Sequence, residues 1–401
     1  MRQEYTKKEY ERILSMELTE PEIVKERIQE TYGMIRTDSR CKKSMCGKKR
    51  MHGLIRGMSA AAAALVLSVT VCAANPAMAA KLPFIGHVFR TVGADSGFAG
   101  DFENGAVQLV EPDAVQEDGT TDSPYVQTDN GVTFTISECN YGSMAMYLAV
   151  GIESEEGFSK DFRNFARYGS YEETTESEMA VPYSTLYMES TSEADFSASG
   201  KGTYQGNPAE GTSSPYYIEG KFVDDHIFAG IIRVDLVHMG ILDETGGWKE
   251  FDYKDLPDAF SYALHITDLF ADVEGEHLSG NWDFVLDVKL NREATVQKEV
   301  QDTNEEGIGI GTVTKTAYEL YADLLVPDGR EHTDYVVAVC DAEGKPLESQ
   351  AEYAEIYSVY GRDVSRVYVY VVEETVYMDE CKGNNYIHLP EKAVYQTEVV
   401  F

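Results

Sequence analysis

The chain has 401 residues, of which 43% are hydrophobic, and a formal net charge of −35. This length exceeds one typical domain, and the apolar fraction suffices for packed cores, which excludes a wholly disordered chain. Residues 1–80 contain 14 Lys and Arg against 9 Asp and Glu, whereas the rest contains 20 against 60. We therefore expect the two parts to occupy different compartments, and the acidic part to bind no nucleic acid.

Residues 1–52 carry two short stretches with the spacing of amphipathic helices. The second begins with Thr19 and Glu22 in a capping-box arrangement and has Pro21 in its first turn. Helices of at most about four turns are marginal in water, so their apolar stripes need a surface to pack on. The stripe residues, which are the candidate partner-binding residues, are Ile13, Leu14, Leu18, Val24, Ile28 and Ile35. They predict a specific cytoplasmic protein partner; a weak helical hairpin, or helices lying on the membrane surface, is the alternative.

An apolar stretch from Leu54 to Ala74 contains a single charge, Arg56. At about 1.5 Å per residue such a helix is about 31 Å long, which matches a hydrocarbon core of about 30 Å. Residues 40–56 contain seven Lys and Arg and no acidic residue, which indicates the cytoplasmic side. We therefore predict a single-pass protein of the cell membrane, with a transmembrane helix at 53–76 in contact with lipid, a cytoplasmic N-terminus and an extracellular C-terminal region.

A signal peptide cut after Ala79 is the alternative to this anchor. More than fifty residues precede the apolar core, however, whereas signal peptides run about 15–30 residues in all. The sequence therefore favours a permanent anchor, followed by a juxtamembrane segment and acidic linker at 77–124.

Alternating apolar and polar residues dominate the chain after Tyr125. The Asp-Asn-Gly turn at 129–131 and the alternation around it are typical of strands joined in hairpins. The residues expected to face a core from three of these strands are Val132, Phe134 and Ile136, then Met144, Met146, Leu148, Val150 and Ile152, then Trp282, Phe284, Leu286, Val288 and Leu290.

The fold class expected is mainly β, with short cytoplasmic helices, one transmembrane helix and two extracellular antiparallel β-sandwich modules. These modules are placed at 125–290 and 291–401. Helical pattern is scarce after the span, with one short candidate at 256–270, and the Ser-, Thr- and Gly-rich stretch 155–220 is expected to form long loops.

Sequence patterns for catalysis or metal binding are absent. There is no H-E-x-x-H and no G-x-S-x-G motif. Cys41, Cys46 and His52 have a spacing outside the usual zinc patterns. A stretch at 302–307 resembles the start of a calcium loop, but Val313 stands where the bidentate acid is needed. We predict no enzymatic activity, no cofactor and no metal site.

Three cysteines, Cys139, Cys340 and Cys381, fall in the predicted extracellular part. A disulfide is chemically permitted there, with Cys340 and Cys381 as the favoured pair. Three buried thiols are the alternative, because the number is odd.

The run NPAMAAKLPFIGHVF at 75–89 follows the Ala-rich span and precedes a TDNGVTFTI hairpin at 128–136. With the segment PEIVKERIQET at 21–31, these stretches resemble a family of single-pass proteins of Gram-positive bacteria, often encoded beside extracytoplasmic-function sigma factors. The similar stretch spans roughly 50–155. The family's outer region begins with a domain of unknown function, and its members are regarded as anti-sigma factors. The resemblance supplies no binding residue for this chain.

The resemblance and the uneven charge together predict a membrane-anchored regulator of an envelope response. Its cytoplasmic arm would bind an extracytoplasmic-function sigma factor through the stripe residues, and its β modules would sense an unknown envelope ligand. The alternative is an anchored, adhesin-like cell-surface binding protein whose N-terminal tail only sets its topology.

Overall fold

The computed structural model describes residues 88–92, 98, 102, 105–110, 122–169, 183–197, 203–204, 207–208, 210–242, 248–250, 252–350 and 355–401. The predicted arm at 1–52 and the predicted span at 53–76 lie outside these residues. So do the six partner-binding residues Ile13, Leu14, Leu18, Val24, Ile28 and Ile35. Among the helices that the structure describes, none is long and apolar enough to cross a membrane.

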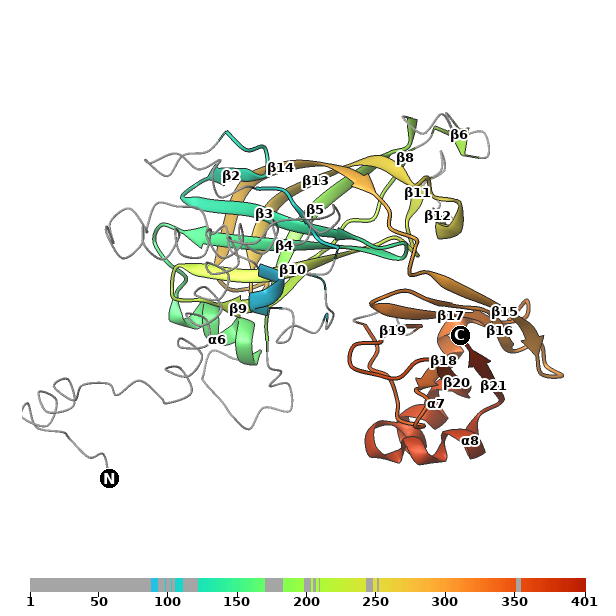
Figure 1. The fold of residues 1–401 in the computed structure, drawn as a ribbon. Helices are drawn as coiled ribbons and strands as arrows, with labels where there is room; N and C mark the ends of the chain where they lie inside the picture. The colour runs from blue at the N-terminus through green and yellow to red at the C-terminus, as the bar shows by residue number, and fades with distance from the viewer. Residues whose placement is uncertain are drawn as a thin grey trace, which may run out of the picture. The chain divides into compact units, whose positions relative to one another are not determined.

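The described part is mainly β with antiparallel strand pairs, as predicted (Figure 1). Its largest element is a ten-stranded sheet, called here the large sheet, in the order β1-β3-β4-β10-β9-β5-β13-β14, with β2 paired to β3 and β8 to β5. Its strands are β1 (Val107–Gln108), β2 (Val126–Asp129), β3 (Val132–Tyr141), β4 (Ala145–Ser154), β5 (Ser184–Asp195), β8 (Glu210–Gly211), β9 (Tyr217–Phe222), β10 (Ile227–Asp235), β13 (Ala259–Phe270) and β14 (His277–Lys289).

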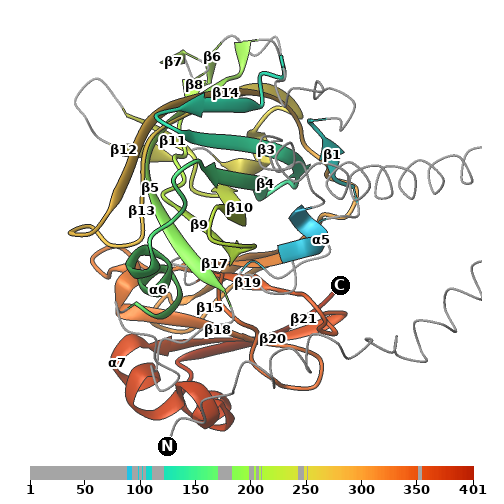
Figure 2. The same cartoon turned by 90° about the vertical axis from the view of Figure 1, so that its left-hand side faces the viewer.

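The large sheet curls into a half-barrel, so that β14 at one end approaches β2 and β3 at the other (Figure 2). Asn130 Nδ2 donates to the carbonyl of Ser279 at 3.0 Å, and Trp282 Nε1 donates to the carbonyl of Val132 at 3.2 Å. Register shifts in β3 and β13 mark bulges, which bend and twist strands locally. The residues expected to form a first sandwich therefore form one sheet that encloses its own core.

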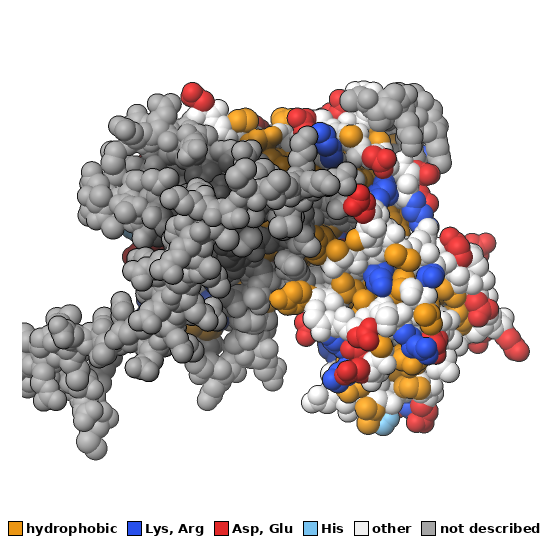
Figure 3. Space-filling model, viewed as in Figure 1, with side chains coloured by type: hydrophobic (Ala, Val, Ile, Leu, Met, Phe, Trp, Pro, Cys, Tyr) orange, Lys and Arg blue, Asp and Glu red, His pale blue; other side chains and the backbone are white. Residues whose placement is uncertain are grey.

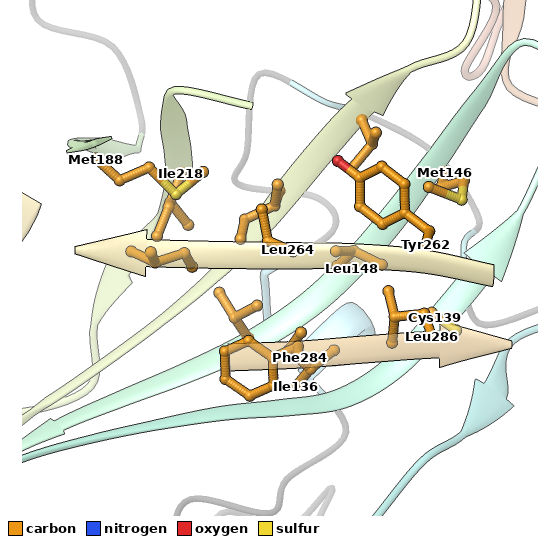
Figure 4. Packing of buried hydrophobic residues seen from close by; sticks show 14 of the residues in the cluster. Ile136, Cys139, Met146, Leu148, Met188, Ile218, Tyr262, Leu264, Phe284 and Leu286 are labelled. Carbon is orange, nitrogen blue, oxygen red and sulfur yellow. The ribbon is translucent and has the colours of Figure 1, made fainter. Parts of the chain in front are cut away.

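The concave face of the large sheet carries the main hydrophobic core (Figure 4). Side chains from β3, β4, β13 and β14 point toward one another there. The inward alternation predicted for β3, β4 and β14 is confirmed. Trp282 and Phe134 are fully buried, with ring centroids 6.1 Å apart. Helix α6 (Lys160–Tyr168) adds Phe162 to this core, and Ser159 caps it by accepting a hydrogen bond from the backbone of Phe162.

Two local predictions about this part are wrong. The helix candidate at 256–270 is strand β13, preceded by a short 3₁₀ turn, η3 (Tyr253–Asp255). Its side chains alternate in burial along the strand, so the two-residue period prevails over the helical one. The stretch 155–220, expected to form loops, contains α6 and the whole of β5.

The chain after the large sheet forms two smaller sheets, called here the C-terminal sheets, which share one core. A four-stranded sheet has the order β15-β16-β17-β19 and a three-stranded sheet the order β18-β20-β21. The strands are β15 (Val296–Thr303), β16 (Gly309–Lys315), β17 (Glu319–Leu325), β18 (Tyr335–Cys340), β19 (Ile356–Ser358), β20 (Arg366–Glu373) and β21 (Tyr395–Val400).

The other elements are short. They are α5 (Val88–Val92), the pairs β6 (Thr203–Tyr204) with β7 (Asn207–Pro208) and β11 (Gly240–Leu242) with β12 (Trp248–Glu250), and then η4 (His332–Asp334), α7 (Glu374–Val376), η5 (Tyr377–Cys381), η6 (Gly383–His388) and α8 (Leu389–Lys392). Cys340 and Cys381 lie in one apolar cluster with Leu389, and Cys139 lies in the main core. All three are buried free thiols, which is the alternative left open to the Cys340–Cys381 disulfide.

Candidate functional site

Strands β4 and β10 are buried on both faces, unlike a strand with one wet side. Met146, Leu148 and Val150 of β4 point into the main core, so the residues between them point outward. The outward apolar positions are Ala145, Tyr147 and Ala149 on β4 and Ala229 and Ile231 on β10. Because three of these five side chains are single methyl groups, another segment can approach the sheet closely.

Helix α5 occupies this outer face of the large sheet (Figure 2). Val88, Phe89 and Val92 are buried there, together with Phe98 and Phe102 further along the chain. These five residues are called here the N-terminal segment, because they are the first that the structure describes. Burying apolar side chains of this size contributes roughly 1.5–3 kcal/mol each. The sheet therefore holds the N-terminal segment largely by apolar packing.

Phe102 is the point at which the N-terminal segment meets both the large sheet and the C-terminal sheets. Its ring centroid lies 4.2 Å from that of Tyr147 on β4 and 5.0 Å from that of Tyr318, the residue before β17. Asn140 Nδ2 donates to the carbonyl of Phe102 at 3.1 Å and to the hydroxyl of Tyr318 at 2.7 Å. The buried Asn140 side chain of the large sheet thus links the N-terminal segment to the C-terminal sheets.

A buried ion pair lies beside this aromatic group. Arg233 of β10 donates from Nε to Glu319 Oε1 at 2.7 Å and from Nη2 to Glu319 Oε2 at 3.0 Å. The hydroxyl of Tyr147 also donates to Glu319. Arg233 is 7% exposed and Glu319 1% exposed. The bidentate ion pair therefore compensates for the hydration that both charged groups lose on burial. We call the group formed by Phe102, Asn140, Tyr147, Arg233, Tyr318 and Glu319 the junction.

Asp235 and His238 extend the ion pair along the end of β10. Arg233 Nη1 lies 3.4 Å from Asp235 Oδ1, and His238 Nδ1 lies 2.6 Å from Asp235 Oδ2. Burial opposes ionisation of Asp235, but Arg233 and the hydrogen bonds from His238 and Val237 lower its pKa below the ordinary value. Asp235 therefore supplies a second negative charge to Arg233.

The pKa values of Arg233 and Tyr147 follow from the same contacts. Desolvation opposes the charge on Arg233, but Glu319 and Asp235 together raise its pKa well above the ordinary value. Burial, and then the Glu319 carboxylate, raise the pKa of Tyr147 well above its ordinary value. Tyr147 therefore stays a neutral donor and Arg233 a cation, which fixes the hydrogen-bond pattern at physiological pH.

The junction holds the N-terminal segment, the large sheet and the C-terminal sheets in place against one another. Every charge in it is matched by an opposite charge or a donor from another part of the chain, as in a structural contact. Across the residues that the structure describes, no group of three or more His, Cys, Asp or Glu is placed to hold a metal ion. On the visible face of Figure 3, acidic and basic side chains of the described residues are interspersed over the surface.

Sequence reasoning did not find the junction. The six residues predicted to bind a partner lie before Val88, outside the described residues, so the structure brings none of them to a site. A signal was present, because Arg233 interrupts the apolar run IFAGIIRV and Glu319 begins the strand ELYADLL. Their pairing across 86 positions was not visible in the sequence.

Comparisons with known proteins give a domain name without an activity. Residues 49–154 match the model of a domain of unknown function, DUF4179, close to the stretch 50–155 of the expected resemblance. No curated protein matches the chain. A solved structure described as the crystal structure of the conserved domain protein from Bacillus anthracis is similar, with 14% sequence identity and a TM-score of 0.39. The match covers 80% of this chain and 99% of that one.

Proposed function

We propose that this chain is a membrane-anchored anti-sigma factor. Its cytoplasmic arm, residues 1–52, holds an extracytoplasmic-function sigma factor inactive, and the helix at 53–76 anchors it in the membrane. Its extracellular β modules, at 125–290 and 291–401, respond to an envelope signal.

The junction is the observation that carries this proposal. The N-terminal segment begins twelve positions after the end of the predicted span and is buried against the large sheet, with Phe102 in contact with Tyr318. A change in how the large sheet and the C-terminal sheets contact each other would therefore reach the N-terminal segment, whose residues are the first described ones after the predicted anchor. A surface-binding protein with a passive stalk has no need for such a buried connection.

The charge of the chain supports the same orientation. The basic residues before the span suit the cytoplasmic side, and the outer residues carry 60 acidic against 20 basic side chains. The apolar stripe through Ile13, Leu18 and Ile28 then faces the compartment in which sigma factors act.

The test is an affinity capture from a lysate of the source organism, with residues 1–52 as bait. We expect the native arm to retain a sigma factor and the Ile28→Asp arm to lose it, because a buried carboxylate disrupts an apolar contact. Gln29→Asp is the matched control, since it adds the same group at the next position, which faces away from the stripe. Equal capture by the native and Ile28→Asp arms would show that the stripe does not bind the sigma factor.

Deletion of residues 2–36 distinguishes this proposal from the adhesin-like alternative. A regulator without its arm loses control of its sigma factor, which a reporter gene measures. An adhesin-like protein without its tail keeps its surface binding and leaves the reporter unchanged.

A further inference from the structure

The four-stranded sheet has two unlike faces. Val313, Leu320 and Ala322 face the core shared with the three-stranded sheet. The opposite face carries Thr312, Thr314, Glu319 and Tyr321. Thr314 Oγ1 lies 2.7 Å from the hydroxyl of Tyr253, and Tyr321 packs against the main core. The face that meets the large sheet and its flanking turns therefore combines polar, hydrogen-bonded residues with two apolar contacts, Tyr321 and its paired residue Ile356, which reach the main core.

The C-terminal sheets and their loops also contain buried polar atoms without hydrogen-bond partners. Within the described residues, Thr312 Oγ1 and both amide atoms of Gln350 are buried without a hydrogen-bond partner. Gln350 is 1% exposed and its backbone N–H bonds to Ile356, which itself reaches the main core. Buried donors and acceptors without partners oppose burial, and water would satisfy them if the contact opened.

One short connector joins the large sheet to the C-terminal sheets. The chain passes from β14 to β15 through residues 290–295 and does not return to the large sheet. Leu290 and Asn291 are fixed by backbone bonds to Asp258 and Tyr141, and a turn follows in which Thr295 bonds to Arg292. Polar contacts with a single connecting segment are typical of domains that move relative to each other.

We propose that the C-terminal sheets form a hinged unit that moves about residues 292–295. In the closed arrangement Tyr318 and Glu319 complete the junction. In the open arrangement they leave it, so that Phe102 loses an aromatic neighbour and Arg233 and Tyr147 become hydrated. A ligand that binds the open arrangement more tightly would shift the population toward it and loosen the N-terminal segment.

This hinge deepens the proposed regulator, and its biological meaning rests on that function. Tyr318 and Glu319 are consecutive, so one end of β17 makes both the aromatic and the ionic contact. The aromatic and the ionic contact are therefore made or lost together. The interface between the C-terminal sheets and the large sheet then has two discrete states.

The experiment is hydrogen exchange of the full chain in detergent, followed by mass spectrometry and without any partner. In Glu319→Gln, which leaves Arg233 without its main counter-charge, we expect peptides covering 88–92 and 98–110 to exchange at least about tenfold faster. Peptides of β13 and β14 should exchange as in the native chain. Glu398→Gln is the matched control, because it removes the exposed ion pair with Arg366 between β20 and β21, strands that contribute no residue to the junction.

A second variant guards against simple loss of folding. Arg233→Met combined with Glu319→Leu and Asp235→Asn replaces the ion pair by an apolar pair and removes the second buried carboxylate that Arg233 neutralises. Replacing buried charges by neutral side chains of similar volume often stabilises a buried contact. We expect it to restore or exceed the native protection of the peptides covering 88–92 and 98–110. The hinge is refuted if Glu319→Gln leaves these peptides unchanged, if β13 and β14 accelerate equally, or if the apolar pair fails to restore protection. Sigma-factor capture by residues 1–52 is measured separately, so either proposal can fail alone.

Discussion

Glu153 provides a quantitative test of the electrostatics of the large sheet. It lies on β4 opposite Thr133 and Ile227, close to the turn that joins β9 to β10. Burial first, and then repulsion by Asp224, raise its pKa from 4.5 to about 7. The folded chain therefore binds this proton more tightly than the unfolded chain does.

The sign of the pH effect follows from this raised pKa. The contribution of the protonated carboxyl to stability is complete below pH 4.5 and is lost as the pH rises through about 7. A pKa change of this size corresponds to at most about 3 kcal/mol. Because the side chain is only partly buried, solvent screening reduces this to about 1–2 kcal/mol. We expect the free energy of unfolding of Glu153→Gln to exceed that of the native chain by about 1–2 kcal/mol at pH 8. At pH 5 the difference should fall to about a quarter of that value.

Urea unfolding of the full chain in detergent measures this difference through the emission of Trp282. Trp282 is fully buried in the main core, and Trp248→Phe removes the second of the two tryptophans from the signal. Glu156→Gln is the control, since Glu156 is exposed just after the end of β4. Equal free energies of unfolding for Glu153→Gln and the native chain at pH 8 would refute the reasoning, as would the same pH trend in Glu156→Gln.

Two further predictions concern close packing. Gly220→Ala should lower the free energy of unfolding by about 3 kcal/mol or more, because its Cβ would lie 2.1 Å from the carbonyl oxygen of Ala229 on the paired strand; thermal unfolding checks this, and a loss under about 1 kcal/mol would contradict it. Burial raises the pKa of Cys340 to about 11 and also raises that of Cys381, so both thiols should resist a thiol-specific reagent at pH 8 in the native chain and react after addition of urea. Rapid labelling without urea would show that these sites open or that the buried positions are wrong.

Much of the strand pattern was predictable because burial on one face imposes a two-residue period. Val132, Phe134 and Ile136 face the core as their alternation predicted. Strand β13 was misassigned because Phe260 and Leu264 also fit a helical spacing of four. Tyr262 and Ile266, which are fully buried at the two-residue spacing on either side of Leu264, decide between the periods.

How the large sheet closes was not predictable from the local pattern. Alternation shows that a strand has a buried face, but a facing sheet and the far side of a curled sheet bury it equally well. The decision lies in long-range contacts such as Trp282 with Val132, 150 positions apart, and in bulges whose positions the sequence does not mark.

The junction could not be predicted for a related reason, and its composition indicates what it does. A well-packed apolar pair of similar volume is often as stable as a buried ion pair or more so, so Arg233 and Glu319 add little stability over such a pair. They contribute a defined orientation, because two parallel hydrogen bonds fix how β17 lies against β10. They also permit separation, because water can solvate both charges once the contact opens. A contact that specifies one arrangement without making it permanent is what the proposed transmission between the C-terminal sheets and the N-terminal segment requires.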